Sequence, residues 1–448
     1  MSTLAKQKQF DTERLTRLAE LALNEAKRQG MDQAEVGVSN SSGLSVTVRL
    51  GDIETLEHYR DQSLGLTVYK DKRKGSASTS DLSETAVREA VRAACSIAGF
   101  TAQDEYAGLA DAALMARNIP DLDLYHVWEL QADKAIELAQ ACEGAARDVD
   151  KQISNSEGAT VVAFGAANLY ANTHGFIGGY SGTRHSISCS VIAGEGEHMQ
   201  RDYWYTTDRN PQKLQAPDAV GREAAKRALR RLNARKIPTA QLPVLFVPEM
   251  ARGLLGNFVS AIRGGALYRK ASFLLDHKGK PVFPEFIDLV EQPHLPGALG
   301  SAPFDNEGVA TREHAIVSKG VLQDYVLDAY SARRLGTQTT GNAGGVHNLS
   351  INSTGQDQQG LIKQMERGLL VTEMMGHGVN NVTGDYSRGA SGFWVENGEV
   401  QYPVQEITIA GTLKKMFMGI VGVGNDIDVR GNIRCGSILV DSMTVAGD

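Results

Sequence analysis

Histidine side chains are the first candidates for metal chemistry in this 448-residue chain. There are ten of them, and none lies within five residues of another: His58, His126, His174, His185, His198, His277, His294, His314, His347 and His377. Two imidazoles share a metal from one helix face only when they lie about three or four residues apart. The spacing therefore predicts no metal site on a single helix, and a site assembled from distant segments stays open.

Cys435, in the stretch GNIRCGS, is the candidate nucleophile. Arg434 precedes it, and a neighbouring cation favours the reactive thiolate. A catalytic cysteine also needs a histidine base nearby, and no histidine adjoins it in sequence. We favour the interpretation of a small residue in a tight strand-to-turn segment. The other cysteines, Cys95, Cys142 and Cys189, make no CxxC pair, a usage typical of a cytoplasmic protein without a disulfide framework.

Two glycine-rich segments combine polar side chains with accessible backbone groups. They are TTGNAGGVHN at 339–348 and TGDYSRGASG at 383–392. Neither contains the GxxxxGK[ST] pattern of a phosphate-binding loop. Such a segment can hold an anion or an extended peptide, and an ordinary structured loop is an equally good interpretation. The candidate lining residues are Asn342, His347, Asp385, Ser387 and Arg388.

The first half of the chain must position these segments through helices and strands. Helical periodicity and caps predict helices at 12–29 (with Asp11 as N-cap), 84–99, 131–148 and 220–232. Alternating polarity predicts three short antiparallel strands within 34–39, 44–60 and 63–78, and further strands between 153 and 207. Helices on one face of an antiparallel sheet make an α+β unit.

The second half opens with a buried strand, PVLFV, followed by a helix that contains GLLGNFVSA at 253–261. Leu254, Leu255 and Phe258 belong to an apolar stripe at helical spacing. Gly256 and Asn257 are poor helix formers in the middle of that helix. They belong to a small-residue side, which we expect to border a dry packing contact or an empty cavity.

We expect three parts in the chain. They are an N-terminal α+β domain at 1–115, a middle α+β segment at 116–239 packed with it, and a β-rich C-terminal domain at 240–448. The last part is predicted to carry helices at about 250–262, 359–377 and 411–418, and a hairpin turn at ENGE. The fold class is α+β.

Composition narrows the class of partner. The net charge is −7, with 46 basic and 53 acidic residues, which argues against nucleic acid as a direct partner. The basic residues of 220–232 are interpreted as a solvated helix face. No window approaches the roughly 18 consecutive apolar residues of a membrane span. We expect a cytoplasmic protein with no membrane association.

Three long segments resemble the PmbA (TldE) branch of the TldD/PmbA metalloprotease family, also known as modulators of DNA gyrase. They lie at 59–83, 371–411 and 420–437, for example IVGVGNDIDVRGNIRCGS, and the resemblance covers essentially the whole chain. It implies a cytosolic metalloprotease system that matures a peptide microcin and degrades an antitoxin. The implied fold is an α+β N-terminal half and a β-rich C-terminal domain.

The catalytic TldD branch of that family carries an HExxxH motif on the first helix of its C-terminal domain. Its two histidines, helped by a cysteine near the C-terminus, hold zinc, and its glutamate suits a general base. The resemblance places Gly256, Asn257 and Ala261 at the three motif positions and Cys435 at the cysteine position. It therefore implies no catalytic residue and no metal in this chain, with zinc expected in a TldD-like partner.

The resemblance implies a non-catalytic subunit that pairs with a TldD-like catalytic subunit around an extended or unfolded peptide, and a homodimer when that partner is absent. Two alternatives stay open. One is an independent metallopeptidase whose site combines His347 and His377 with Cys435. The other is a regulator of gyrase or of a toxin–antitoxin pair that acts without proteolysis.

Overall fold

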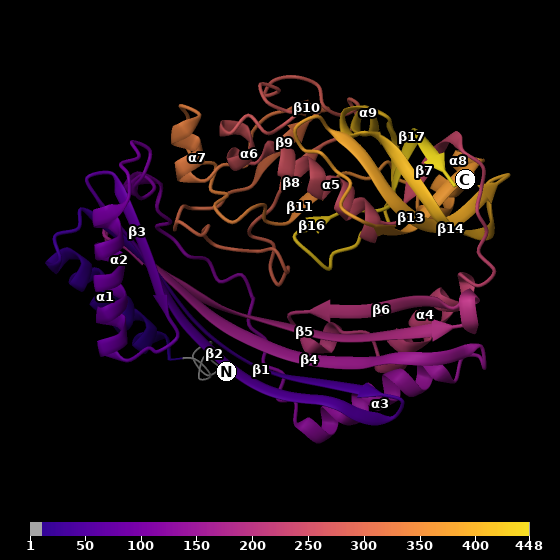
Figure 1. The fold of residues 1–448 in the computed structure, drawn as a ribbon, viewed down its shortest axis with the longest axis horizontal. Helices are drawn as coiled ribbons and strands as arrows, with labels where there is room; N and C mark the ends of the chain where they lie inside the picture. The colour runs from indigo at the N-terminus through magenta and orange to yellow at the C-terminus, as the bar shows by residue number, and fades with distance from the viewer. Residues whose placement is uncertain (1–10, 448) are drawn as a thin grey trace.

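A long six-stranded antiparallel sheet carries the first half of the chain. The computed structural model describes residues 11–447, and Figure 1 shows this sheet as a curved layer below the C-terminal half. The strand order is β3-β2-β1-β4-β5-β6. The strands are β1 (Gln33–Arg49), β2 (Asp52–Lys70), β3 (Arg73–Thr79), β4 (Ile153–Asn172), β5 (Ile177–Ala193) and β6 (Gln200–Asp208).

Alternation of buried and more exposed side chains gives the sheet two different faces. In β1, Val36 and Val38 are buried, while Gly37 and Ser39 between them point the other way. Four helices cover the apolar face in two pairs, as Figure 1 shows. They are α1 (Thr12–Arg28), α2 (Glu84–Phe100), α3 (Ala132–Arg147) and α4 (Pro217–Arg230). The polar face, with its small side chains, is left for the C-terminal half.

The predicted helices of this half are confirmed. Asp11 caps α1 by accepting a hydrogen bond from the Arg14 backbone N–H at 2.9 Å, and Ser83 caps α2. Helix α4 begins three residues earlier than predicted, because Pro217 is well suited to the first helical turn. The α+β fold class is confirmed as well.

The predicted strand boundaries at 34–39, 44–60 and 63–78 are wrong. β1 continues through the polar stretch SNSSG, and the chain turns at Leu50–Gly51 and at Asp71–Lys72, where φ is positive. Polar and glycine residues at alternate positions lie on the open face and leave the backbone ladder unbroken. The polar, glycine-containing composition of this stretch is typical of a loop, although the stretch lies inside a strand.

The second half is built on two further sheets. One has the order β14-β13-β12-β7-β17-β15 and the other β10-β9-β8-β11-β16. The first contains β7 (Ala240–Phe246), β12 (Gly368–Met375), β13 (Asp385–Glu396), β14 (Glu399–Thr412), β15 (Ile420–Val423) and β17 (Ile438–Ala446). The second contains β8 (Leu289–Glu291), β9 (His314–Ser318), β10 (Val321–Leu322), β11 (Leu349–Ile351) and β16 (Ile433–Arg434).

Five helices accompany these sheets: α5 (Pro248–Ile262), α6 (Gly264–Tyr268), α7 (Ala329–Arg334), α8 (Gln358–Met365) and α9 (Leu413–Met418). Short 3₁₀ turns lie at Ala112–Leu114, Gly196–His198 and Pro211–Lys213. Within residues 11–447, no helix is long and apolar enough to cross a membrane.

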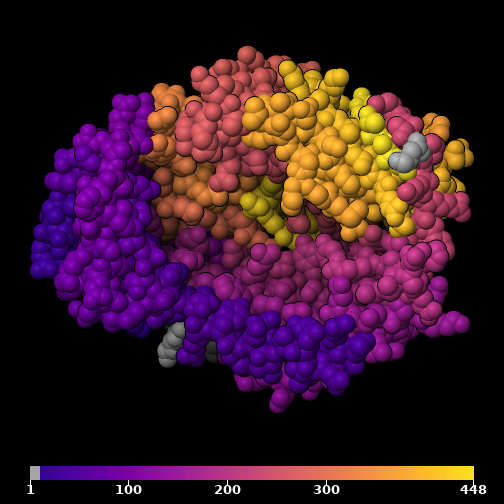
Figure 2. Space-filling view, in the orientation of Figure 1, coloured from indigo at the N-terminus to yellow at the C-terminus, as the bar shows by residue number. Residues whose placement is uncertain are grey.

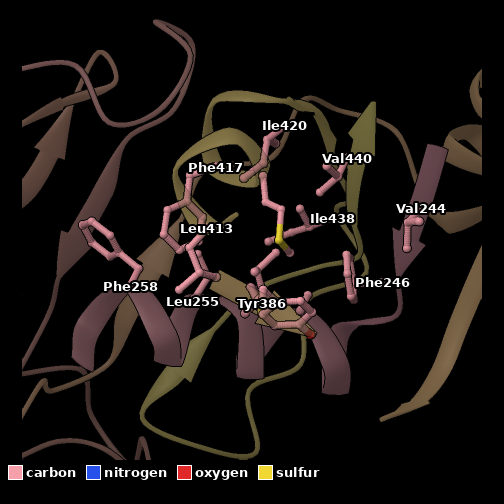
Figure 3. Close-up of a cluster of buried hydrophobic side chains, with 14 of the residues drawn as sticks. Val244, Phe246, Leu255, Phe258, Tyr386, Leu413, Phe417, Ile420, Ile438 and Val440 are labelled. Carbon is pink, nitrogen blue, oxygen red and sulfur yellow. The ribbon is translucent and has the colours of Figure 1, made fainter. Parts of the chain in front are cut away.

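Helix α5 is held by the main core of this half. Phe258 meets Phe283 and Phe417 edge-on, with ring centroids 4.9 and 5.8 Å away. Figure 3 shows Leu255 gathered with Tyr386 and other side chains of this cluster. The apolar side of α5 is thereby fixed, and its other side is the one available for function.

The helix predicted at 359–377 is correct only in its first half. α8 ends at Met365, and Glu366 then takes a positive φ of 56°. The following apolar run becomes β12, a central strand paired in parallel with β7 and antiparallel to β13. A strand buried on both faces reads as continuous apolar sequence, which periodicity does not separate from a helix. The ENGE hairpin turn is confirmed between β13 and β14, with positive φ at Asn397 and Gly398.

Three arginines join the two halves by binding backbone carbonyls. Arg333 of α7 donates to the carbonyls of Tyr106, Gly108 and Leu109. Arg209, after β6, donates to those of Ala298 and Leu299 at 3.0 Å each. Arg430 donates to the carbonyl of Tyr205, stacks on Trp204, and pairs with Glu249 and Asp428. The C-terminal half is thus attached along the length of the sheet.

The contact between α3 and α4 yields a test of this packing. A Cβ atom on Gly221 would lie 1.9 Å from the Cys142 carbonyl oxygen, so Gly221→Ala should destabilise the fold by about 1–3 kcal/mol. Gly144, in α3, has no neighbour within 4 Å of its Cβ position in the described part of the chain, so Gly144→Ala should stabilise the fold by up to about 1 kcal/mol. Urea unfolding midpoints measure both. Equal shifts of the same sign would contradict the close packing of α3 on α4.

Candidate functional site

The apolar stripe predicted on α5 is confirmed. The helix follows β7 directly and begins with Pro248, which suits a first helical position. Leu254, Leu255 and Phe258 are fully buried. On the opposite side, Gly253 and Ser260 are exposed, and Gly256 and Asn257 are half-buried.

None of the three motif positions on α5 provides a zinc ligand. Gly256 has no side chain, and no atom of residues 11–447 beyond its own surroundings in the helix lies within 4 Å of its Cβ position. The Ala261 methyl is fully buried in the core. Asn257 carries a neutral amide where a general base would need a carboxylate. The donor set therefore does not fit zinc, and the small-residue side is open at Gly256.

Cys435 lies beside the start of this helix but is not a reactive thiol. Its side chain is 0 % exposed, and its Sγ is 3.7 Å from the Pro248 carbonyl oxygen. Burial, reinforced by the negative charge of Asp428, raises the pKa of the Cys435 thiol to about 12. The cation that opposes this effect is Arg252 and not the adjacent Arg434; burial outweighs it, and the thiol keeps its proton at neutral pH.

The alternative metal site is not assembled in the structure. His377 is exposed in the connection between β12 and β13, and His347 is half-buried at the end of the 339–348 segment. Within residues 11–447, no three histidine, cysteine, aspartate or glutamate side chains lie together as metal ligands. His347, His377 and Cys435 therefore do not combine.

The candidate residues Asn342 and His347 meet at the buried carboxylate of Glu291. The Asn342 amide donates to both Glu291 oxygens at 2.8 and 2.9 Å, and the His347 backbone N–H donates at 2.5 Å. His347 Nδ1 lies 3.0 Å from the same carboxylate, and His314 Nδ1 lies 3.6 Å away. Glu291 is 1 % exposed, so these donors satisfy the hydrogen-bonding capacity of its buried carboxyl group. Asn342 is buried and holds the loop against Glu291, whereas the half-buried His347 is partly accessible at the loop surface.

The 339–348 segment forms one wall of a groove above the polar face of the long sheet. Two adjoining clefts of about 390 and 530 Å³ share Asn168, Tyr180, Phe304 and Asn306 in their linings. Figure 2 shows the hollow between the sheet and the C-terminal half. β1, β2, β4 and β5 make the floor, and residues 299–306 and 343–347 make the opposite wall. His347 is the sequence candidate that lines it.

Two acidic side chains behind this wall have raised pKa values. Burial raises the pKa of Asp305 to about 6, although three backbone N–H groups donate to its carboxylate. Burial raises the pKa of Glu307 to about 8, and the negative charges of Asp305, Asp328 and Glu35 add to the effect. Glu307 is therefore mostly protonated at neutral pH.

The other three candidates lie on β13 and outside this groove lining. Asp385 and Ser387 are exposed, and Arg388 is half-buried with a buried Nε atom that has no hydrogen-bond partner among the described residues. Tyr386, between them, donates to the Met374 sulfur at 2.9 Å. Met374 in turn lies 3.6 Å from the Cβ position of Gly253. β13 thus borders the open side of α5.

Sequence reasoning missed most of the groove. Its floor residues, such as Asn168, Tyr180 and Arg184, come from strands whose partners are remote in sequence. The pattern that could have revealed the floor is the alternation of apolar and other residues along these strands. In β4 and β5 the positions between the buried residues are mostly polar, aromatic or glycine, such as Phe164, Asn168 and Gly182, which is typical of a sheet face that does not enter a core.

Comparisons with known proteins agree with this architecture. Three family models match, described as PmbA/TldA metallopeptidase domain 1 (residues 34–98), central domain (125–232) and C-terminal domain (239–447). The chain is 50 % identical over 416 residues to metalloprotease PmbA of Escherichia coli O157:H7, covering 93 % of this chain and 92 % of that protein. It is also 50 % identical over 417 residues to a PmbA homologue of Haemophilus influenzae, with the same two shares.

Solved structures share the whole fold. A candidate modulator of DNA gyrase from Bacteroides thetaiotaomicron superposes with a TM-score of 0.92 at 31 % identity, covering 97 % of this chain and 99 % of that one. TldE from Thermococcus kodakarensis superposes with a TM-score of 0.80 at 20 % identity, covering 96 % and 100 %, which is a likeness of fold.

The raised pKa of Glu307 predicts how stability depends on pH. The Glu307 carboxyl keeps its proton up to about pH 8 in the folded chain but only up to about pH 4.5 in the unfolded chain. Its contribution to the free energy of unfolding is therefore complete below pH 4.5 and is lost as pH rises toward 8. Glu307→Gln, which mimics the protonated acid, should flatten the fall of the thermal midpoint between those values. Glu285→Gln, at an exposed carboxyl, is the control. Identical pH profiles for Glu307→Gln and the parent chain would refute the assignment.

Proposed function

This chain belongs to the PmbA branch of the PmbA/TldD metallopeptidase family, and we propose that it is the non-catalytic subunit of a cytoplasmic zinc metallopeptidase. A TldD-like partner supplies the zinc and the general base. Together the two chains degrade or process unfolded peptides. When the partner is absent, the chain pairs with a second copy of itself.

The open side of α5 is the observation that carries this proposal. The helix keeps a buried apolar stripe and a side of small residues, but Gly256, Asn257 and Ala261 provide neither a zinc ligand nor a base. Cys435 beside it holds a protonated thiol. A chain with this helix needs a second chain for metal-dependent hydrolysis.

The groove supports the part of the proposal that concerns the peptide. Its floor is a sheet face of small and polar side chains, and its wall is a glycine-rich segment. An extended peptide offers two rows of backbone groups, which such surfaces bind with little dependence on sequence. A folded protein would not enter clefts of about 390 and 530 Å³.

Zinc content and peptide cleavage test the division of labour. The purified chain alone should contain far less than one zinc per chain and should leave an unfolded peptide intact, because α5 lacks the ligands. Mixing with a TldD-like chain should give a complex that contains zinc and cleaves the peptide. Elemental analysis and chromatographic cleavage assays measure both.

The controls separate the alternatives. A partner with its zinc ligands replaced should give an intact but inactive complex. Stoichiometric zinc and cleavage in the isolated chain would instead establish an independent metallopeptidase. Failure of the zinc-loaded complex to cleave any unfolded peptide, with an effect on gyrase that does not depend on zinc, would favour the regulator.

The β13 candidates have a separate test, because this strand borders the open side of α5 through Met374. Asp385→Ala and Arg388→Ala should each lower the cleavage rate of the complex several-fold, by removing polar contacts to the peptide backbone. Asp52→Ala and Arg92→Ala, at exposed positions on the sheet and on α2, are charge-matched controls. Cleavage kinetics unchanged from the controls would exclude these residues from the peptide path.

A further inference from the structure

The charged side chains that line the smaller cleft are both arginines. They are Arg184 and Arg209, and among the described residues no aspartate or glutamate belongs to this lining, in which His347 contacts the buried Glu291 behind it. The chain as a whole carries a net charge of −7, so its average surface is acidic. A cleft of the opposite sign in an acidic chain concentrates positive potential where a ligand would bind.

Arg209 is a fixed cation in this cleft. Its guanidinium donates to the carbonyl oxygens of Thr183, Ala298 and Leu299 at 3.0–3.3 Å. It rests against the sheet at Gly182, where a Cβ atom would come within 2.7 Å of Arg209 Nη1. Carbonyl groups orient the cation without neutralising it, and among residues 11–447 no carboxylate lies within ion-pair distance of Arg209. The negative charge of the neighbouring Asp208 offsets its positive charge only through space.

Arg184 is a second cation, and it is free to move toward a ligand. It lies two residues after Gly182 on the same face of β5, and its side chain is exposed. Its Nε donates to the Thr207 hydroxyl at 3.3 Å, and it too has no carboxylate partner within the described residues. The remaining N–H groups of its guanidinium can form a paired contact with a carboxylate.

Neutral groups in the same lining complete a peptide site. Asn168 and Asn306 carry amides that suit backbone groups, and Tyr180 and Phe304 meet edge-on at 5.5 Å as an apolar surface. Cations, amides and one aromatic surface suit a short segment that is both apolar and acidic. The sequence contains no GxxxxGK[ST] phosphate-binding pattern.

We propose that this cleft selects a carboxylate of the extended peptide, held between Arg184 and Arg209. The proposal rests on the proposed function, since the occupant is the peptide substrate, and it adds a charge preference. The carboxylate can come from an aspartate or glutamate side chain or from the C-terminus of the peptide. Both sources present the same planar anion to a guanidinium.

Binding of fluorescent peptides to the isolated full-length chain tests this proposal directly. One peptide carries glutamates and a free C-terminus, a second has glutamine in their place, and a third has glutamates with an amidated C-terminus. The parent chain should bind the first about threefold to tenfold more tightly than the weaker of the other two, with the preference falling as salt rises. Which of the two loses affinity identifies the source of the carboxylate.

Arg184→Gln tests the site, because this side chain is exposed and its loss leaves the attachment by Arg209 intact. Arg184→Gln should reduce the ratio of the two peptide affinities to about one. Arg92→Gln, an equal charge change on α2, should leave that ratio as it is in the parent chain. Equal affinities of the parent chain for all three peptides, or a preference that Arg184→Gln leaves unchanged, would overturn the proposal. If the charge preference fails but the complex with a TldD-like chain cleaves the neutral peptide, only the carboxylate proposal is overturned. If the complex cleaves none of the peptides, the proposed function is overturned as well.

Discussion

The alternation of side chains along the long strands is the constraint on which the rest of the molecule depends. Residues such as Val36 and Val38 must lie on one face, because two pairs of helices are held there by apolar contact. The intervening positions are then forced onto the other face. Glycine, serine and asparagine at those positions limit the apolar surface of that face, which meets the C-terminal half in a small apolar cluster that includes Phe176 and Phe304. A groove between the sheet and the C-terminal half is the geometric result.

The groove is kept open by the way in which the two halves are joined. Arg333, Arg209 and Arg430 reach across to backbone carbonyls on the opposite half. A guanidinium bound to several carbonyls fixes the distance between two backbones without needing a continuous packed interface. Glu291 has a similar role inside the C-terminal half, where it holds the Asn342–His347 loop against β8 and thereby fixes the wall of the groove.

Local sequence patterns correctly predicted the helix caps and the hairpin turn, because each of these is determined by neighbouring residues. Helices α1 and α2 have caps at Asp11 and Ser83, and the ENGE turn supplies residues that tolerate positive φ, so each was recognisable from a few neighbouring letters. β12 was mistaken for helix because a strand between two others is apolar on both faces, and only its partners distinguish it. The loop at 339–348 was correctly singled out, but its anchor is Glu291, about fifty residues earlier, and no pattern links the two. Arg184 faces the groove from a paired strand and Arg209 from the segment that follows β6, and no local pattern links the two.

Helix α5 shows what packing within one chain leaves unexplained. Glycine in a helix interior costs about 1 kcal/mol relative to alanine, and Gly256 has room for a methyl group. Glycines such as Gly221 are required by a close backbone contact within the chain, whereas Gly256 has no such contact among the described residues. The apolar stripe requires a helix at this place, but it does not require a bare, open side. In the proposed assembly that side faces the space in which a partner and a peptide meet, and a small residue there keeps the space free. The bare side of α5 is then a feature of the assembly and not of the packing of this chain alone.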